Sequence, residues 1–99
     1  MGEQHVSQRW SLRFPAETQI CHFDGESLVF NPLSWETHLL NVSAAEVVSV
    51  LSEGPQYFDI LVGRMREAGM NVQNGVSVED QLEGLLIELE SLGIAIRSL

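Results

Sequence analysis

The feature that most constrains this chain is a junction in its first half, where a strand pattern stops and a helix start follows directly. Residues 35–40 alternate between two faces of an extended chain, which is the pattern of a half-buried strand. One face carries Trp35, Thr37 and Leu39, and the other carries Glu36, His38 and Leu40. We therefore predict a strand over residues 35–40 that stops at Asn41.

The residues after Asn41 form a helix-capping pattern. Ser43 can accept a hydrogen bond from the backbone N–H of Glu46, and the Glu46 side chain can reach back to Ser43. Val42 and Val47 then occupy the two positions of a hydrophobic staple. This pattern predicts a helix that is capped by Ser43 and runs over residues 43–53.

Two further strand signals precede the junction. Residues 18–23 and 27–30 flank Asp24-Gly25, a dipeptide that favours a two-residue type I′ turn and therefore predicts a β-hairpin. With the strand at residues 35–40, this hairpin makes a meander of three antiparallel strands. Residues 10–14 alternate as well, and they form either a short strand or an extended arm.

The second half of the chain is predicted to be helical. Residues 56–68 carry apolar side chains at helical spacing, and residues 70–76 are polar and contain asparagine and glycine, which indicates a loop. Ser77 begins a capping pattern that opens a third helix ending at Gly93. Residues 94–96 add either a short strand or an apolar tail.

The third helix has two distinct faces. Six apolar residues share one face and are predicted to be core: Val78, Leu82, Leu85, Leu86, Leu89 and Leu92. The opposite face carries small residues around Ile87, including Gly84 and Ser91. Ile87 is there either as a single exposed apolar residue or as part of the wall of a shallow groove.

The length and the composition predict one folded domain. The chain has 99 residues, 44% of them hydrophobic, and we assign residues 9–99 to a single domain after a disordered segment of residues 1–8. No apolar run is long enough to span a membrane, and the N-terminus lacks the pattern of a signal peptide. The one cysteine, Cys21, is expected to be partly buried in a strand. We expect a cytoplasmic protein.

The charge balance argues against polyanionic partners. The chain has fourteen acidic residues, five arginines and no lysine, which gives a net charge of -9. Proteins that bind nucleic acids or anionic membranes gain much of their affinity from clustered Lys and Arg. We therefore expect neither nucleic acid nor a membrane as a partner.

The sequence contains no strong signal for catalysis, a cofactor or a metal. Its glycines lack the spacing of a phosphate-binding loop. Cys21 and His22 are adjacent, so in a strand they point to opposite faces and are poorly placed to ligate one metal ion. The serines fall at turns and caps, without a partner histidine that the sequence identifies. We expect a protein that is not an enzyme and needs no cofactor.

The order of the elements, together with several short motifs, resembles a known family. The sequence is similar to the PqqD-like peptide chaperones, also called RiPP precursor peptide recognition elements, and most of all to the branch found beside kinases related to the HPr kinase. The resemblance covers residues 10–96. It rests on Asp24-Gly25-Glu26, Asn31-Pro32-Leu33-Ser34, Thr37-His38-Leu39-Leu40-Asn41, Ala44-Ala45-Glu46 and Leu89-Glu90-Ser91-Leu92-Gly93-Ile94.

The resemblance implies a winged-helix-like α+β domain, a three-stranded antiparallel meander followed by three helices, without catalytic activity. In the family, the leader segment of a ribosomally made precursor peptide adds to the third strand and packs against the third helix, for presentation to a modifying enzyme. The strand residues implied here are Trp35, Glu36, Thr37, His38, Leu39 and Leu40. Those implied on the helix are Gly84, Leu86, Ile87 and Ser91. Because the chain lacks lysine, a neutral or basic peptide is the expected ligand.

Two other uses of such a domain remain open at this point. A winged-helix DNA-binding regulator would have a similar order of strands and helices, although the acidic third helix argues against it. A homodimer that pairs its own edge strands is also compatible with the sequence, and it does not exclude peptide binding.

Overall fold

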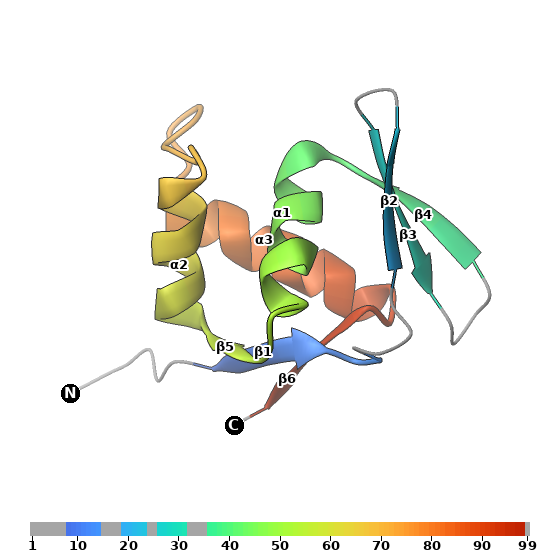
Figure 1. Ribbon diagram of the computed structural model, residues 1–99. Coiled ribbons are helices and arrows are strands. Elements are labelled where there is room, and N and C mark those ends of the chain that lie inside the picture. Colours follow the sequence, from blue (N-terminus) through green and yellow to red (C-terminus); the bar gives the residue numbers. More distant parts are fainter. Residues whose placement is uncertain (1–7, 15–18, 24–25, 32–35, 99) are drawn as a thin grey trace.

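The fold is built from two small antiparallel sheets and three helices (Figure 1). The computed structural model describes residues 8–14, 19–23, 26–31 and 36–98, and every count below refers to them. The first sheet has the order β2-β3-β4, with β2 at Gln19–Phe23, β3 at Glu26–Asn31 and β4 at Glu36–Leu40. The second has the order β5-β1-β6, with β5 at Gln56–Tyr57, β1 at Arg9–Leu12 and β6 at Ala95–Ser98. The helices are α1 at Val42–Leu51, α2 at Phe58–Glu67 and α3 at Val78–Ser91.

The predicted α+β class is confirmed, with an antiparallel meander followed by three helices. In the β2–β3 hairpin Phe23 pairs with Glu26, so the two strands are joined by two residues, as the sequence predicts. The proposed turn type at residues 24–25 lies outside the described residues. β4 pairs with β3 from Asn31 opposite Glu36 to Ser27 opposite Leu40.

The second sheet joins segments that are far apart in the sequence. β1 lies between β5 and β6, where Arg9 pairs with both Tyr57 and Ser98. Of the alternatives that the sequence left open, residues 10–14 contribute a strand rather than an arm, and the C-terminal segment is a strand rather than a tail. Figure 1 shows this sheet beneath the helices.

Two predicted boundaries near this sheet are wrong. Gln56 and Tyr57 belong to β5 and not to the second helix, because their backbone pairs with β1. Gln8 is ordered rather than frayed: its backbone oxygen accepts a hydrogen bond from the N–H of Phe58 at 2.9 Å, and its side chain accepts one from Arg97 at 3.1 Å. The remainder of the predicted disordered segment lies outside the described residues.

Helix α1 is the central element of the core. Six of its ten residues are buried, and it contacts β1, β3, β4, α2 and α3. It therefore connects the two sheets to each other and to the other helices. The core side chains from the strands include Trp10 and Leu12 of β1, Val29 of β3 and Leu40 of β4.

The start of α1 differs from the predicted one. Asn41 is the N-cap, and its side-chain oxygen accepts a hydrogen bond from the N–H of Ala44 at 2.7 Å. Ser43 is therefore not the cap, and Val42 is not a staple residue: it is the first residue of the helix and 78% exposed. With the cap at Asn41, the staple positions fall on Leu40 and Ala45, which are both buried.

The predicted start and core face of α3 are confirmed. Ser77 is the N-cap, and its hydroxyl oxygen accepts a hydrogen bond from the N–H of Asp80 at 3.1 Å. Val78, Leu82, Leu86 and Leu89 are buried, and Leu85 and Leu92 pack against the core. The apolar residues that recur with the 3.6-residue period of a helix thus lie on the face of α3 that is buried in the core.

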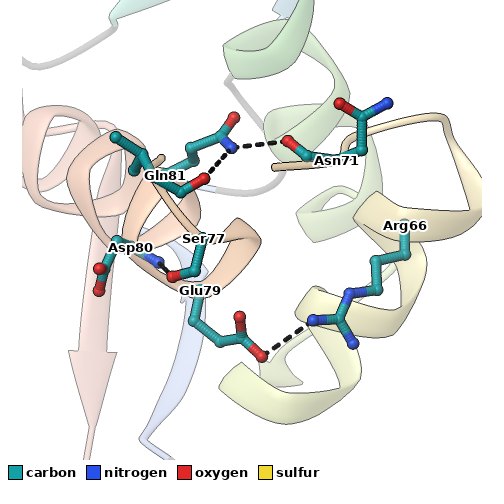
Figure 2. A network of polar contacts seen from close by, with 7 residues as sticks. Arg66, Asn71, Ser77, Glu79, Asp80 and Gln81 are labelled. Carbon is teal, nitrogen blue, oxygen red and sulfur yellow. Dashed lines mark hydrogen bonds and ion pairs between the residues drawn. The ribbon is translucent and has the colours of Figure 1, made fainter. Parts of the chain in front are cut away.

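Three ion pairs connect elements at the surface. Arg64 of α2 binds Glu53, which follows α1; Arg66 of α2 binds Glu79 of α3; and Arg97 of β6 binds Glu90 of α3. Figure 2 shows the pair between Arg66 and Glu79. The pair of Arg66 with Glu79 is the most exposed of the three and contributes little to stability, whereas the pair of Arg97 with Glu90 is partly buried.

Candidate functional site

The open edge of β4 is the main candidate for a binding surface. β4 pairs with β3 on one side, and no strand of the described part of the chain lies beside its other edge. An edge of this kind offers backbone N–H and C=O groups to another extended chain. Its C-terminal end is well anchored, because Leu40 is buried and Asn41 caps α1 directly after it.

The side chains of β4 divide between the two faces of the meander. Leu40 is buried and His38 is half-buried, whereas Leu39 points to the opposite face and is 62% exposed. The side chains of Glu36 and Thr37 lie outside what the structure describes, as does Trp35 altogether. Among the predicted strand residues whose side chains the structure describes, which are His38, Leu39 and Leu40, Leu39 is the one clearly presented to solvent.

Leu39 belongs to a row of apolar residues across the outer face of the meander. The strand register places Cys21 opposite Leu28, and Leu28 opposite Leu39. Cys21 is exposed, contrary to the prediction that it is partly buried, and Leu28 is half-buried. Adjacent residues of a strand point to opposite faces of the sheet. Ile20 of β2 points inward and packs against the core, so its neighbour Cys21 points outward. The two-residue hairpin connection already determines that Cys21 lies opposite Leu28, whereas the pairing of Leu28 with Leu39 depends on the longer connection between β3 and β4.

The residues predicted on the third helix are only partly confirmed as a surface. Gly84, Ile87 and Ser91 are exposed, with Ile87 at 46%, and the Ser91 hydroxyl donates a hydrogen bond to the backbone oxygen of Glu88. Leu86 is fully buried, so its inclusion among the peptide contacts was wrong. Its helical position, four residues after Leu82 and three before Leu89, places it on the core face.

The predicted peptide contacts lie on β4 and on α3, and both of these elements contact α1. The main contacts of β4 are with β3 and α1, whereas those of α3 are with α1, α2 and β6. Figure 1 accordingly shows α1 beside β4 and in front of α3. The open edge of β4 and the outer face of α3 are thus connected mainly through α1, and a peptide that contacts both must extend beyond the strand edge.

The exposed surface of α3 is acidic. Glu79, Asp80, Glu83 and Glu88 are all exposed, and of these Glu79 is bound to Arg66. At the end of the helix, hydrogen bonds from Arg97 hold the pKa of Glu90 below its usual value and favour the ionised carboxylate. A cation or a basic segment is the type of ligand that this surface attracts.

The described residues hold no group of three or more His, Cys, Asp and Glu side chains that could bind a metal ion. Among the described helices, none combines the length and the apolar character required to cross a membrane. Comparisons with protein-family models, with curated proteins and with solved structures found no significant match. The functional argument therefore depends on the residues and on the geometry described above.

Proposed function

We propose that this chain is a non-catalytic peptide-binding adaptor. An extended segment of a ribosomally synthesised precursor peptide adds to β4 as a fourth strand of the meander, and the bound peptide is presented to a modifying enzyme in the cytoplasm. The observation that supports this most directly is the position of β4 at the edge of its sheet, beside an exposed Leu39 and an anchored C-terminal end.

Strand addition divides affinity and selectivity between backbone and side chains. The main-chain hydrogen bonds to β4 supply affinity with few demands on sequence, while alternate peptide side chains contact the two faces of the sheet. On the outer face, an apolar peptide side chain beside β4 would extend the row formed by Cys21, Leu28 and Leu39. A peptide with an apolar residue at that position is therefore favoured.

The charge of the chain favours a neutral or basic peptide over a nucleic acid. The net charge is -9, and exposed carboxylates on α3 repel the phosphates of DNA. A winged-helix regulator would need Arg, Lys, Asn or Gln side chains on its recognition helix. This difference in charge supports the peptide as ligand.

The test follows backbone amide signals of the isotope-labelled protein by NMR while peptides encoded by neighbouring genes are added. We expect the amides of residues 36–40 to shift with the cognate peptide. Two versions of that peptide, N-methylated at alternate residues, then test the mode of binding. In a peptide strand beside β4, every second N–H group is directed toward β4 and can donate to it. Methylation of those N–H groups should reduce the affinity, whereas methylation of the N–H groups directed away from β4 should not.

A matched pair of variants tests the part played by α3. Ile87→Ala is expected to weaken peptide binding, whereas Ile60→Ala, which removes an equally exposed isoleucine on α2, should not. If no candidate peptide shifts the β4 amides, or if both N-methylated versions bind equally well, strand addition at β4 is wrong.

A further inference from the structure

A hollow between α1, α2 and α3 has no part in strand addition. It is lined by the start of α1, the end of α2, the loop that follows α2 and the first turn of α3. Its volume is about 210 Å³, whereas pockets for small molecules usually enclose roughly 300–1,000 Å³. The size of this hollow suits one long side chain better than a cofactor.

Part of the lining of the hollow is apolar, and the rest is polar. Met65 of α2 is buried, Met70 packs against the core, and Val42 at the start of α1 is 78% exposed. Methionine side chains are flexible and adapt to the shape of what they contact. The aliphatic part of a long side chain can therefore be accommodated here.

The one charged side chain among the residues that line the hollow is an anion, Glu46. Arg64 is close enough for Glu46 to contribute to its raised pKa, but Glu53 raises that pKa most of all, and Glu67 raises it as well. Both terminal nitrogens of Arg64 donate to the Glu53 carboxylate, at 3.1 and 3.0 Å. None of the ion pairs in the described part of the chain involves Glu46, so this carboxylate lines the hollow without a cation bound to it.

Gln81 adds an acceptor with a fixed orientation. Its side-chain nitrogen donates to the backbone oxygens of Asn71 at 2.7 Å and of Val76 at 3.0 Å (Figure 2). If the amide nitrogen and oxygen of Gln81 were exchanged, its Oε1 atom would lie beside the backbone oxygens of Asn71 and Val76, and these three acceptors would repel one another. The Oε1 atom is therefore directed away from this loop. A lining that combines apolar side chains with a carboxylate and an amide oxygen is complementary to a guanidinium group on an aliphatic stem.

The hollow lies close to the point where β4 ends. β4 stops at Leu40, and Val42, two residues further on, already lines the hollow. In Figure 1, β4 runs toward the start of α1. A peptide that continues past Leu40 rises about 3.3 Å per residue, so its next residues pass over this helix start.

We propose that this hollow binds a basic side chain, arginine above all, from the residues that flank the peptide segment added to β4. The nature of the ligand rests on the proposed function, but the affinity of the hollow for a guanidinium group does not. The hollow thus distinguishes peptides that carry an arginine beside the strand-forming segment from peptides that do not. This selectivity cannot come from main-chain pairing alone.

The first experiment uses single-residue probes and no peptide. N-acetyl-arginine amide is titrated into the isotope-labelled protein, with N-acetyl-citrulline amide as the neutral probe of the same shape. We expect the arginine probe to shift the amides of Val42, Glu46, Gly69 and Met70 and to bind more tightly than citrulline. Glu46→Gln should reduce its affinity about fivefold, the effect of losing one partly exposed ion pair. Asp59→Asn removes the same charge from the first turn of α2, outside the hollow and away from the acidic surface of α3, and should change nothing.

Equal shifts with arginine and citrulline, an unchanged affinity in Glu46→Gln, or shifts confined to other parts of the protein would each overturn the proposal. A second experiment replaces the flanking arginine by citrulline in a peptide that shifts the β4 amides. The replacement should weaken binding to the unmodified protein but not to Glu46→Gln, and an equal loss in both proteins would contradict the assignment. Because the single-residue probes do not depend on β4, failure of strand addition and failure of the arginine site give different results.

Discussion

Arg97 lies across the ring of Trp10, with its guanidinium carbon 4.8 Å from the ring centroid. The two residues face each other in the pairing of β1 with β6, and Trp10 is buried beneath. The same guanidinium group donates two hydrogen bonds to Glu90 of α3, at 3.1 and 2.7 Å. One side chain near the end of the chain therefore connects β6, β1 and α3.

Arg97→Ala is predicted to lower the free energy of unfolding by about 1–2 kcal/mol. The substitution removes a cation–π contact of about 0.5–1 kcal/mol and the aliphatic stem that covers Trp10. Unfolding in urea, followed by circular dichroism, measures the loss. Arg66→Ala serves as the control, because its pair with Glu79 is more exposed and its loss should stay within about 0.5 kcal/mol. If both variants lose the same amount of unfolding free energy, the contact of the Arg97 guanidinium group with the Trp10 ring does not contribute to stability.

The pair of Arg97 with Glu90 also predicts a dependence of stability on pH. Hydrogen bonds from Arg97 hold the pKa of Glu90 below its usual value of 4.5 in the folded state. A lowered carboxyl pKa contributes stability that is present above the unfolded pKa and is lost as the pH falls through the folded pKa. Glu90→Gln should therefore destabilise the protein at about pH 6 and have progressively less effect toward about pH 3. In an Arg97→Ala background this dependence should disappear, and its persistence there would contradict the assignment.

The role of Arg97 illustrates what sequence reasoning could not reach. The period of two in residues 10–14 indicates a strand or an extended arm, but nothing local indicates that Arg9 pairs with residues 48 and 89 positions further on, Tyr57 and Ser98. Gln56 and Tyr57 were assigned to a helix for the same reason: their extended conformation is imposed by pairing with β1 rather than by their own propensity. In contrast, the hairpin and the core face of α3 depend on neighbours in the sequence, and both were predicted correctly.

The cap of α1 is predicted to depend on Asn41 and not on Ser43. Asn41→Ala should lower the free energy of unfolding by about 1 kcal/mol, because the N–H of Ala44 loses its acceptor. Ser43→Ala should have an effect within about 0.5 kcal/mol, since Ser43 lies inside the first turn of the helix. Thermal unfolding of both variants distinguishes the two caps. A larger loss for Ser43→Ala would restore the capping box that the sequence suggested.

This cap was mistaken because two residues in the same segment fit the role. Asn41 and Ser43 are both good N-cap residues, and the Glu46 that follows Ser43 by three positions favoured the later start. The deciding factor is tertiary: with the cap at Asn41, Leu40 and Ala45 are buried and Val42 is left exposed. The peptide contacts predicted on α3 contain a similar error, because Leu86 is next to Ile87 in the sequence but lies about 100° around the helix from it, on the buried face.

Leu86→Ala and Ile87→Ala are predicted to separate folding from function on α3. Leu86 is fully buried among the core residues, so its truncation should cost about 2–5 kcal/mol of unfolding free energy through lost burial and a residual cavity. Ile87 is 46% exposed, and its truncation should cost less than about 1 kcal/mol. Urea unfolding gives both values, and titration with a peptide that shifts the β4 amides gives the binding affinity of each variant that remains folded. Weakened binding in Ile87→Ala at near-normal stability assigns the outer face of α3 to the peptide site, whereas unchanged binding confines that site to β4 and the adjoining hollow.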